Sequence, residues 1–160
     1  MADGILSKNV IYKEKMRYTL NLQIDLPRER VIDLFDSTEN LKKWQKGLVS
    51  FETFEGTPGQ EGAKSRLIYK MGKRDVEMIE TIKVRNFPDE FTGIFEAKNV
   101  WNEVKNQFKE TADGHTNWKF ETEFKFKGFM KVMSALMPGA FKKQSLKSMH
   151  AFKDFAESSA

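Results

Sequence analysis

The chain has 160 residues, no cysteine and a net charge of +4 at pH 7 from 27 basic and 23 acidic residues. The absence of cysteine excludes disulfides, thiolate metal sites and cysteine nucleophiles. The start lacks the basic-then-apolar order of a secretory signal, and no apolar run approaches the ~20 residues of a membrane span. We therefore expect a cytoplasmic protein with no integral membrane association.

The charges are interspersed along the chain, as on an ordinary solvated surface. The densest basic group is Lys142, Lys143 and Lys147, which we interpret as the solvated face of a helix. A nucleic-acid partner would need a denser basic cluster, so none is expected. Residues 1–15 show no clear period and are predicted to be an N-terminal extension, with a short helical or extended piece at residues 10–12.

From Met16 the pattern becomes clear. Apolar residues from Tyr18 to Leu26 alternate with polar ones, which is typical of a strand with one solvated face. Pro27 ends this strand and suits the first turn of a helix. Residues 28–35 then have helical spacing. Ser37 or Thr38 offers an N-cap for a second short helix, which Gly47 ends.

After Gly47 the period returns to two. Strands are predicted over residues 48–55, 64–71, 76–87, 90–97, 100–111 and 116–126. The turns between them are short and contain glycine, proline or Asp113-Gly114. Because parallel strands need crossovers of a dozen or more residues, these six strands should form an antiparallel meander.

The last change of period predicts a long amphipathic helix over residues 129–156, with methionine and phenylalanine on its apolar side. Pro138-Gly139 should break it, because proline lacks the donor that a helix interior uses. We expect a short lid piece, residues 129–137, that acts as a mobile gate, and a longer piece that grips the sheet. The whole predicts an α+β fold: a curved antiparallel sheet of about seven strands, two short helices and a C-terminal helix over the sheet.

Three segments carry a resemblance to a known group: residues 26–35 (LPRERVIDLF), residues 41–44 (LKKW) and residues 56–64 (GTPGQEGAK). Together with the order of elements, they resemble the polyketide cyclase/dehydrase-like branch of the SRPBCC (START-like, birch-pollen-allergen-like) superfamily. The resemblance implies one helix-grip domain over residues 16–160 with a cavity for a hydrophobic ligand. Members of this superfamily bind lipids, sterols, plant hormones or polyketides. Some cyclise polyketides, and others act as chaperone co-factors or toxins.

The sequence gives little sign of catalytic chemistry. The two histidines, His115 in a turn and His150 on the last helix, are interpreted as surface residues. No metal-ligand spacing, phosphate loop or nucleophile motif is present, and no cofactor is expected.

Polar residues nevertheless interrupt the inward faces of the predicted strands. Burying such groups unpaired costs ~1–3 kcal/mol each, so they should pair together, meet water or meet a ligand. Two alternatives stay open. Glu80 lies at the open rim of the sheet or is turned outward by a bulge, and, independently, Asn102 and Asn106 only satisfy turn or strand-edge backbone groups. The candidates for holding a polar ligand head are Tyr69, Glu80, Asn102, Asn106 and Thr122. The candidates for enclosing its apolar body are Phe95, Trp118, Phe120, Met133, Met137 and Phe141.

Three functions remain open. The leading hypothesis is a non-catalytic protein, monomeric or homodimeric, that binds a hydrophobic or amphiphilic, lipid- or polyketide-like molecule between sheet and helix. The second is a cyclase or aldol-type enzyme with Glu80 as a base whose pKa is raised by desolvation. The third is an interaction protein that resembles chaperone activators.

Overall fold

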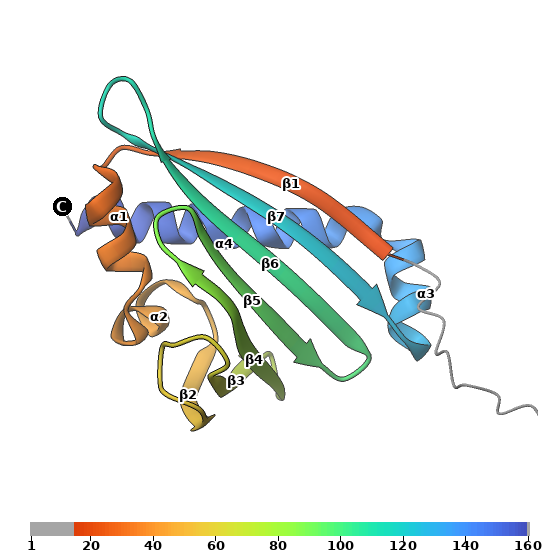
Figure 1. Cartoon of the computed structure of the whole chain (residues 1–160). Coiled ribbons are helices and arrows are strands. Elements are labelled where there is room, and N and C mark those ends of the chain that lie inside the picture. Colours follow the sequence, from red (N-terminus) through yellow and green to blue (C-terminus); the bar gives the residue numbers. More distant parts are fainter. Residues whose placement is uncertain (1–14, 160) are drawn as a thin grey trace, which may run out of the picture.

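The computed structural model describes residues 15–159, so the predicted N-terminal piece at residues 10–12 lies outside the described residues. Seven strands form one antiparallel sheet in the order β1-β7-β6-β5-β4-β3-β2 (Figure 1). The strands are β1 (Lys15–Ile24), β2 (Leu48–Glu55), β3 (Lys64–Met71), β4 (Arg74–Asn86), β5 (Glu90–Ala97), β6 (Val100–Glu110) and β7 (Thr116–Phe126). The helices are α1 (Arg28–Phe35), α2 (Thr38–Trp44), α3 (Gly128–Leu136) and α4 (Pro138–Ser158). The predicted fold class and meander are confirmed.

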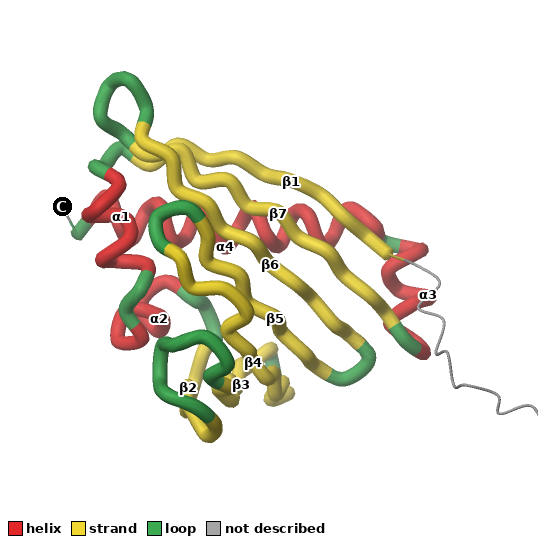
Figure 2. The backbone as a smooth tube through the Cα atoms, viewed as in Figure 1, coloured by secondary structure: helices red, strands yellow, loops and turns green. Residues whose placement is uncertain are grey.

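The sheet curves around α4, which runs along one side of it (Figure 2). We call the side that faces α4 the inner face and the opposite side the outer face. Helices α1 and α2 connect β1 to β2 at one end of the molecule, and α3 lies at the other end. No described helix is long and apolar enough to cross a membrane.

The register fixes which side chains share the inner face. Tyr18 of β1 lies opposite Thr122 of β7, which lies opposite Val104 of β6. Because side chains alternate along a strand, every second residue from Tyr18 on points toward α4. The hydroxyl of Tyr18 confirms this direction, since it shares a 2.8 Å hydrogen bond with the hydroxyl of Ser145 on α4.

The inner face is densely packed near α1 and α2. The ring of Phe152 on α4 lies 5.1 Å from the Trp44 ring and 5.5 Å from the rings of Phe35 and Trp118, measured between centroids. Phe108 of β6 lies 5.1 Å from Phe35. We call Phe35, Trp44, Phe108, Trp118 and Phe152 the aromatic cluster. It holds α1, α2 and α4 against β6 and β7.

The predicted break of the C-terminal helix is also confirmed. Helix α3 ends at Leu136, Met137 separates the two helices, and α4 begins at Pro138. Proline is tolerated at the first position of a helix because no intrahelical bond needs its missing donor there. Two details differ from the predictions: β4 begins at Arg74 instead of residue 76, and the side chain of Ser37, although at the N-cap of α2, makes no capping hydrogen bond.

Candidate functional site

The strand candidates for ligand contact all lie on the inner face. Their order across the sheet follows from the register: Glu80 of β4 is opposite Phe95 of β5, which is opposite Asn102 of β6. A register shift between Ile82 and Val84 places a bulge just beyond Glu80, so the bulge does not turn Glu80 outward. The structure thus gathers side chains from five strands, β3 to β7, on one concave surface.

The amides and the threonine of this surface are occupied by partners within the sheet. Asn102 Nδ2 donates to Thr122 Oγ1 at 2.7 Å and to the Glu123 carbonyl at 3.0 Å. Thr122 Oγ1 donates to the Glu103 carbonyl at 3.1 Å. Asn106 accepts from Trp118 Nε1 at 2.9 Å and donates to the Phe91 carbonyl at 3.3 Å. These side chains therefore offer a ligand little spare hydrogen-bonding capacity, and their placement matches the alternative in which they satisfy internal groups.

Glu80 differs from its polar neighbours. Within residues 15–159 its carboxyl forms no hydrogen bond and no ion pair, and desolvation by burial raises its pKa from 4.5 to about 7. The side chain is only half-buried as a whole, so its carboxyl lies deep in the concavity yet retains some accessible surface. A desolvated carboxyl without a protein partner is the one polar group of this surface that is open to a ligand.

The hydroxyl of Tyr69, on β3, lies next to Gln45 at the end of α2. It donates to Oε1 of Gln45, the residue that follows α2. Burial, and next the charge of Glu80, raise the pKa of Tyr69, which keeps the phenol neutral. The hydrogen bond therefore ties α2 to β3 beside Glu80. Gln45 lies in a connection between elements, where periodicity carries no information, and sequence reasoning missed it.

Trp44 is a second residue that the sequence predictions did not include in the site. Its Nε1 is the one buried side-chain nitrogen or oxygen atom of the described residues that lacks a hydrogen-bond partner. Leaving such a donor unpaired costs roughly 1–3 kcal/mol. Its ring belongs to the aromatic cluster, and Gln45, the partner of Tyr69, is the next residue.

The apolar candidates divide into packed and open positions. Trp118 is buried in the aromatic cluster, whereas Phe95, Phe120 and Met133 are half-buried. Phe141 of α4 packs on the inner face, with its ring 4.9 Å from the Phe126 ring. Met137 lies between α3 and α4 and is 53 % exposed, so the structure does not place it with the enclosed candidates. Met137 lies in the connection between α3 and α4 and not within a continuous helix.

Gly93 on β5 shapes the surface around Phe95. A Cβ atom on Gly93 would lie 3.0 Å from Cε2 of Phe95, which is closer than normal contact. The ring of Phe95 therefore folds back over the bare backbone of its own strand. Because the space above Gly93 is filled by this ring, a larger residue there would push the ring further into the concavity, toward Glu80 and Asn102, which flank Phe95.

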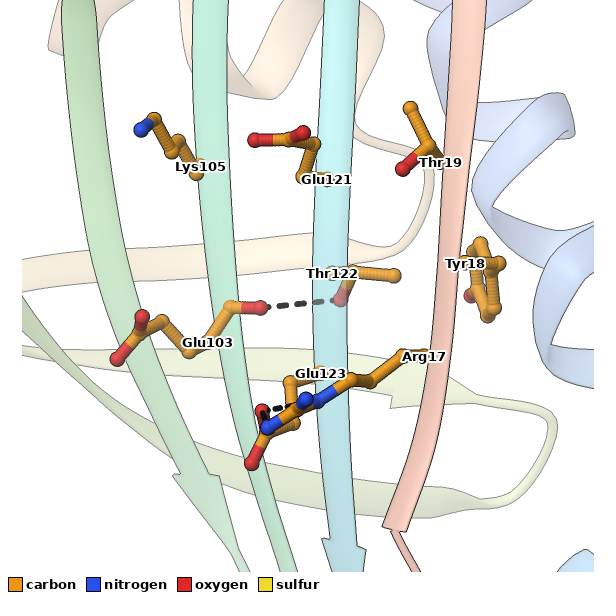
Figure 3. Close-up of a pocket in the computed structure, with 8 residues that line it drawn as sticks. All are labelled: Arg17, Tyr18, Thr19, Glu103, Lys105, Glu121, Thr122 and Glu123. Atoms are coloured by element: carbon orange, nitrogen blue, oxygen red, sulfur yellow. Dashed lines mark hydrogen bonds and ion pairs between the residues drawn. The ribbon is translucent and has the colours of Figure 1, made fainter.

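A hollow of about 420 Å³ lies elsewhere, mainly on the outer face of β1, β7 and β6 (Figure 3). Its walls are mostly charged side chains that form ion pairs, such as Arg17 with Glu123 at 2.5 Å. Lys105 on its rim pairs with Glu90 at 3.3 Å. Since these charges are satisfied and face solvent, we interpret this hollow as the solvated surface of the sheet and not as the ligand site.

The histidines lie outside the inner face. His115 is in the turn before β7, with Nδ1 3.2 Å from Nε2 of Gln23, and His150 is exposed on α4. Among the described residues, no group of three or more histidine, cysteine or acidic side chains is arranged to hold a metal ion.

No family model matches the chain, and no curated protein sequence matches it. Solved structures do. Ara h 8.0201 has a TM-score of 0.72 at 15% identity, with 91% of this chain and 99% of that chain covered. The Zhui aromatase/cyclase from Streptomyces sp. R1128 has a TM-score of 0.75 at 9% identity, with 90% and 94% covered.

A norcoclaurine synthase from Thalictrum, solved as a point mutant with a transition-state analogue, has a TM-score of 0.68 at 12% identity, with 89% of this chain and 94% of that chain covered. Identities this low establish the fold and leave the activity open. The matches span nearly the full length of each neighbour. The chain therefore shares the fold of these proteins, a curved antiparallel sheet with a long C-terminal helix along it, as the resemblance in its sequence implied.

Proposed function

We propose that this protein binds a hydrophobic or amphiphilic small molecule, lipid- or polyketide-like, on the inner face of β3, β4 and β5, with Glu80 as its polar anchor. The observation that carries the proposal is the Glu80 carboxyl, which faces inward, is desolvated and lacks a partner within residues 15–159. Near neutral pH it is partly protonated, and the neutral acid donates a hydrogen bond to a ligand oxygen. Half-buried Phe95 and Met78 beside it supply apolar contact.

The remaining polar groups support a binding role over a reactive one. Asn102, Asn106 and Thr122 are held by partners in the sheet, so they keep the surface rigid and do not act on a substrate. A surface that is mostly apolar with one open polar group suits a ligand with a long apolar body and a single polar head. Structural neighbours with small-molecule chemistry, among them one solved with a transition-state analogue, add weight to this proposal.

The second candidate function is a cyclase or aldol-type enzyme, and one observation favours it. A carboxyl whose pKa is near 7 is suited to take a proton from substrate at neutral pH. The aromatase/cyclase among the structural neighbours supports the same possibility. The third hypothesis from the sequence, a chaperone-activator-like interaction protein, has no specific support on the inner face.

The first experiment is native mass spectrometry of protein isolated gently from its source, to identify a compound that co-purifies with it. Binding isotherms for that compound then compare wild type with Glu80→Gln and with Glu96→Gln. Glu96 is an exposed carboxylate of β5 on the outer face and is the matched control. A carrier should lose no more than about ten-fold in affinity in Glu80→Gln. An enzyme should still bind the compound but lose turnover by ~10²-fold or more.

An apolar fluorescent anion, 1-anilinonaphthalene-8-sulfonate, tests the site without knowledge of the ligand. Its affinity for wild type should fall as the pH rises through about 7, because the ionised Glu80 repels the anion. The affinity of Glu80→Gln should be independent of pH in this range, and that of Glu96→Gln should follow wild type. If wild type and Glu80→Gln show the same pH dependence, Glu80 does not face the binding site and the proposal fails.

A further inference from the structure

Helix α3 exposes an apolar stripe at one end of the molecule. Phe129, Val132 and Leu136 are 69%, 53% and 72% exposed, and their i, i+3, i+7 spacing puts them on one face of the helix. Met130, Met133 and Ser134 are turned inward. Figure 1 shows α3 at the end of the molecule opposite α1 and α2. Large apolar side chains grouped in this way mark an interaction site.

The charge around this stripe has one sign. Residues 124–153 contain seven lysines and no aspartate or glutamate, whereas the whole chain carries a net charge of only +4. The rest of the chain is therefore net negative. Two lysines of this segment pair with carboxylates, Lys125 with Glu123 and Lys153 with Glu157. Four others form no ion pair within residues 15–159: Lys131, Lys142, Lys143 and Lys147.

These lysines lie next to the apolar stripe. Lys131 is on α3 itself, and Lys142 and Lys143 lie within about 8 Å of the start of α4 along its axis, at 1.5 Å per residue. Helix α4 begins two residues after α3 ends. Lys142, Lys143 and Lys147 of α4 are exposed. An exposed apolar helix face flanked by unpaired lysines has the composition of helices that lie in the interface of an anionic membrane.

We propose that α3 and the first turns of α4 form a peripheral docking surface for anionic phospholipid membranes. Phe129, Val132 and Leu136 enter the boundary between headgroups and acyl chains, and the lysines contact the anionic headgroups. This surface is separate from the inner face, and the proposal does not depend on the identity or existence of the ligand bound there. It replaces the interpretation of Lys142, Lys143 and Lys147 as only a solvated face.

Other occupants fit the surface less well. A symmetric dimer through this stripe would bring the same lysine-rich segment of both copies together, and like charges would repel. The stripe also comes from one helix of nine residues, whereas stable interfaces use about 20–30 residues a side. Nucleic acid would use the lysines but leave the apolar stripe exposed, because phosphate contacts need only charge.

The test is co-flotation of the full chain with vesicles of phosphatidylcholine alone or with about one third phosphatidylserine. Wild type should bind the anionic vesicles and not the neutral ones, and binding should fall as salt rises from about 0.1 to 0.5 M. Each lysine near an anionic surface contributes about five-fold in affinity. The variant Lys142→Gln/Lys143→Gln/Lys147→Gln should therefore bind about 100-fold more weakly. Phe129→Ser/Leu136→Ser should lose at least ten-fold.

Matched controls separate this surface from general charge and stickiness. Lys46→Gln/Lys70→Gln/Lys73→Gln removes the same charge from exposed positions near the opposite end of the sheet, and Val49→Ser/Met71→Ser removes exposed apolar side chains there. Both should bind as wild type does, and circular dichroism of each variant checks that it is folded.

Several results would overturn the proposal. One is a wild type that ignores anionic vesicles, or that binds them as tightly after the α3 and α4 changes as after the control changes. Another is a wild type that does not bind vesicles but forms a dimer in solution, which Phe129→Ser/Leu136→Ser converts into a monomer. That result would show that the apolar stripe binds a second copy of the chain. A third is binding to duplex DNA but not to vesicles. Failure of ligand binding on the inner face would change none of these readouts, because the vesicle experiment uses protein without added ligand.

Discussion

Two regions of the inner face are built in opposite ways. Near α1 and α2, the aromatic cluster fills the space between sheet and helices with rings whose centroids lie 5–6 Å apart. Around Glu80, the inward side chains are half-buried and a carboxyl has no partner within residues 15–159. The amides of β6 lie between the two regions and are satisfied by the sheet. The first region supplies stability, and the second leaves a desolvated carboxyl unpaired at a cost in stability.

The largest effect should come from the packed region. Phe152→Ala removes a fully buried ring that contacts α1, α2 and β7. We expect a loss of about 3–5 kcal/mol in the free energy of unfolding, measured by urea denaturation. Phe120→Ala, at a half-buried inner-face position, should cost clearly less. Equal losses would show that the two positions are packed alike and would remove the contrast between them.

The next largest effect should come from Glu80, with the opposite sign. Its pKa is near 7 in the folded state and 4.5 when exposed, so the folded state binds more protons between these values and stability falls as the pH rises through this window. The full shift corresponds to at most about 3 kcal/mol. Glu80→Gln should therefore be more stable than wild type above pH 7 by up to this amount.

The pH series supplies the control for this prediction. Below about pH 4.5 Glu80 is neutral in both the folded and the unfolded state, so wild type and Glu80→Gln should have nearly the same stability there. Urea denaturation from about pH 4 to pH 8, with Glu96→Gln in parallel, measures the difference between the curves. A constant difference across the range would mean that the Glu80 carboxyl is solvated and that this region is not desolvated.

A smaller effect should follow from breaking the amide pairs between the two regions. Asn106→Ala leaves the indole donor of Trp118 without its acceptor and frees the Phe91 carbonyl. The cost should be about 1–3 kcal/mol. Asn102→Ala should cost less, because Thr122 keeps its bond to the Glu103 carbonyl. The reverse order in denaturation experiments would contradict the pairing described here.

The smallest effect should come from the histidine near the β1–β7 edge. His115 is partly exposed in a turn and contacts Gln23 and the side chains of Asp25 and Asp113. His115→Gln should change the free energy of unfolding by less than about 0.5 kcal/mol and leave probe binding unchanged. A loss of binding or of turnover in this variant would place the chemistry outside the inner face.

The gate predicted from the break at Pro138 is tested by hydrogen exchange. If α3 opens on its own, its amides should exchange faster than those of β6 in the absence of ligand. Protection of α3 equal to that of the sheet would contradict a gate. Addition of anionic vesicles should slow exchange in α3 if the docking surface described above is correct, while the exchange of β2 and β3 should not change.

The sequence by itself determined the elements and the pairing of the six strands β2 to β7. Alternation along residues 18–26 and in the six later segments predicted the strands, the short turns predicted the meander, and Pro138 predicted the broken C-terminal helix. The pairing of β1 with β7 was not predicted. The inward direction of Glu80 also follows from the pattern, because Met78, Glu80 and Ile82 share one face of a strand. Local periodicity specifies these features, so tertiary contacts were not needed to predict them.

Tertiary structure alone decided which of the inward polar groups are free. Asn102, Asn106 and Thr122 look equivalent to Glu80 in the sequence, yet the register brings Asn102 to Thr122 and Asn106 to Trp118, while Glu80 lies opposite Phe95 and Ser65. Tyr69 finds Gln45 only because folding brings the residue after α2 to the side chain of β3. The partners in these three hydrogen bonds are 12, 20 and 24 residues apart in the sequence. A pattern within one strand contains no information about the side chains that folding places across from it.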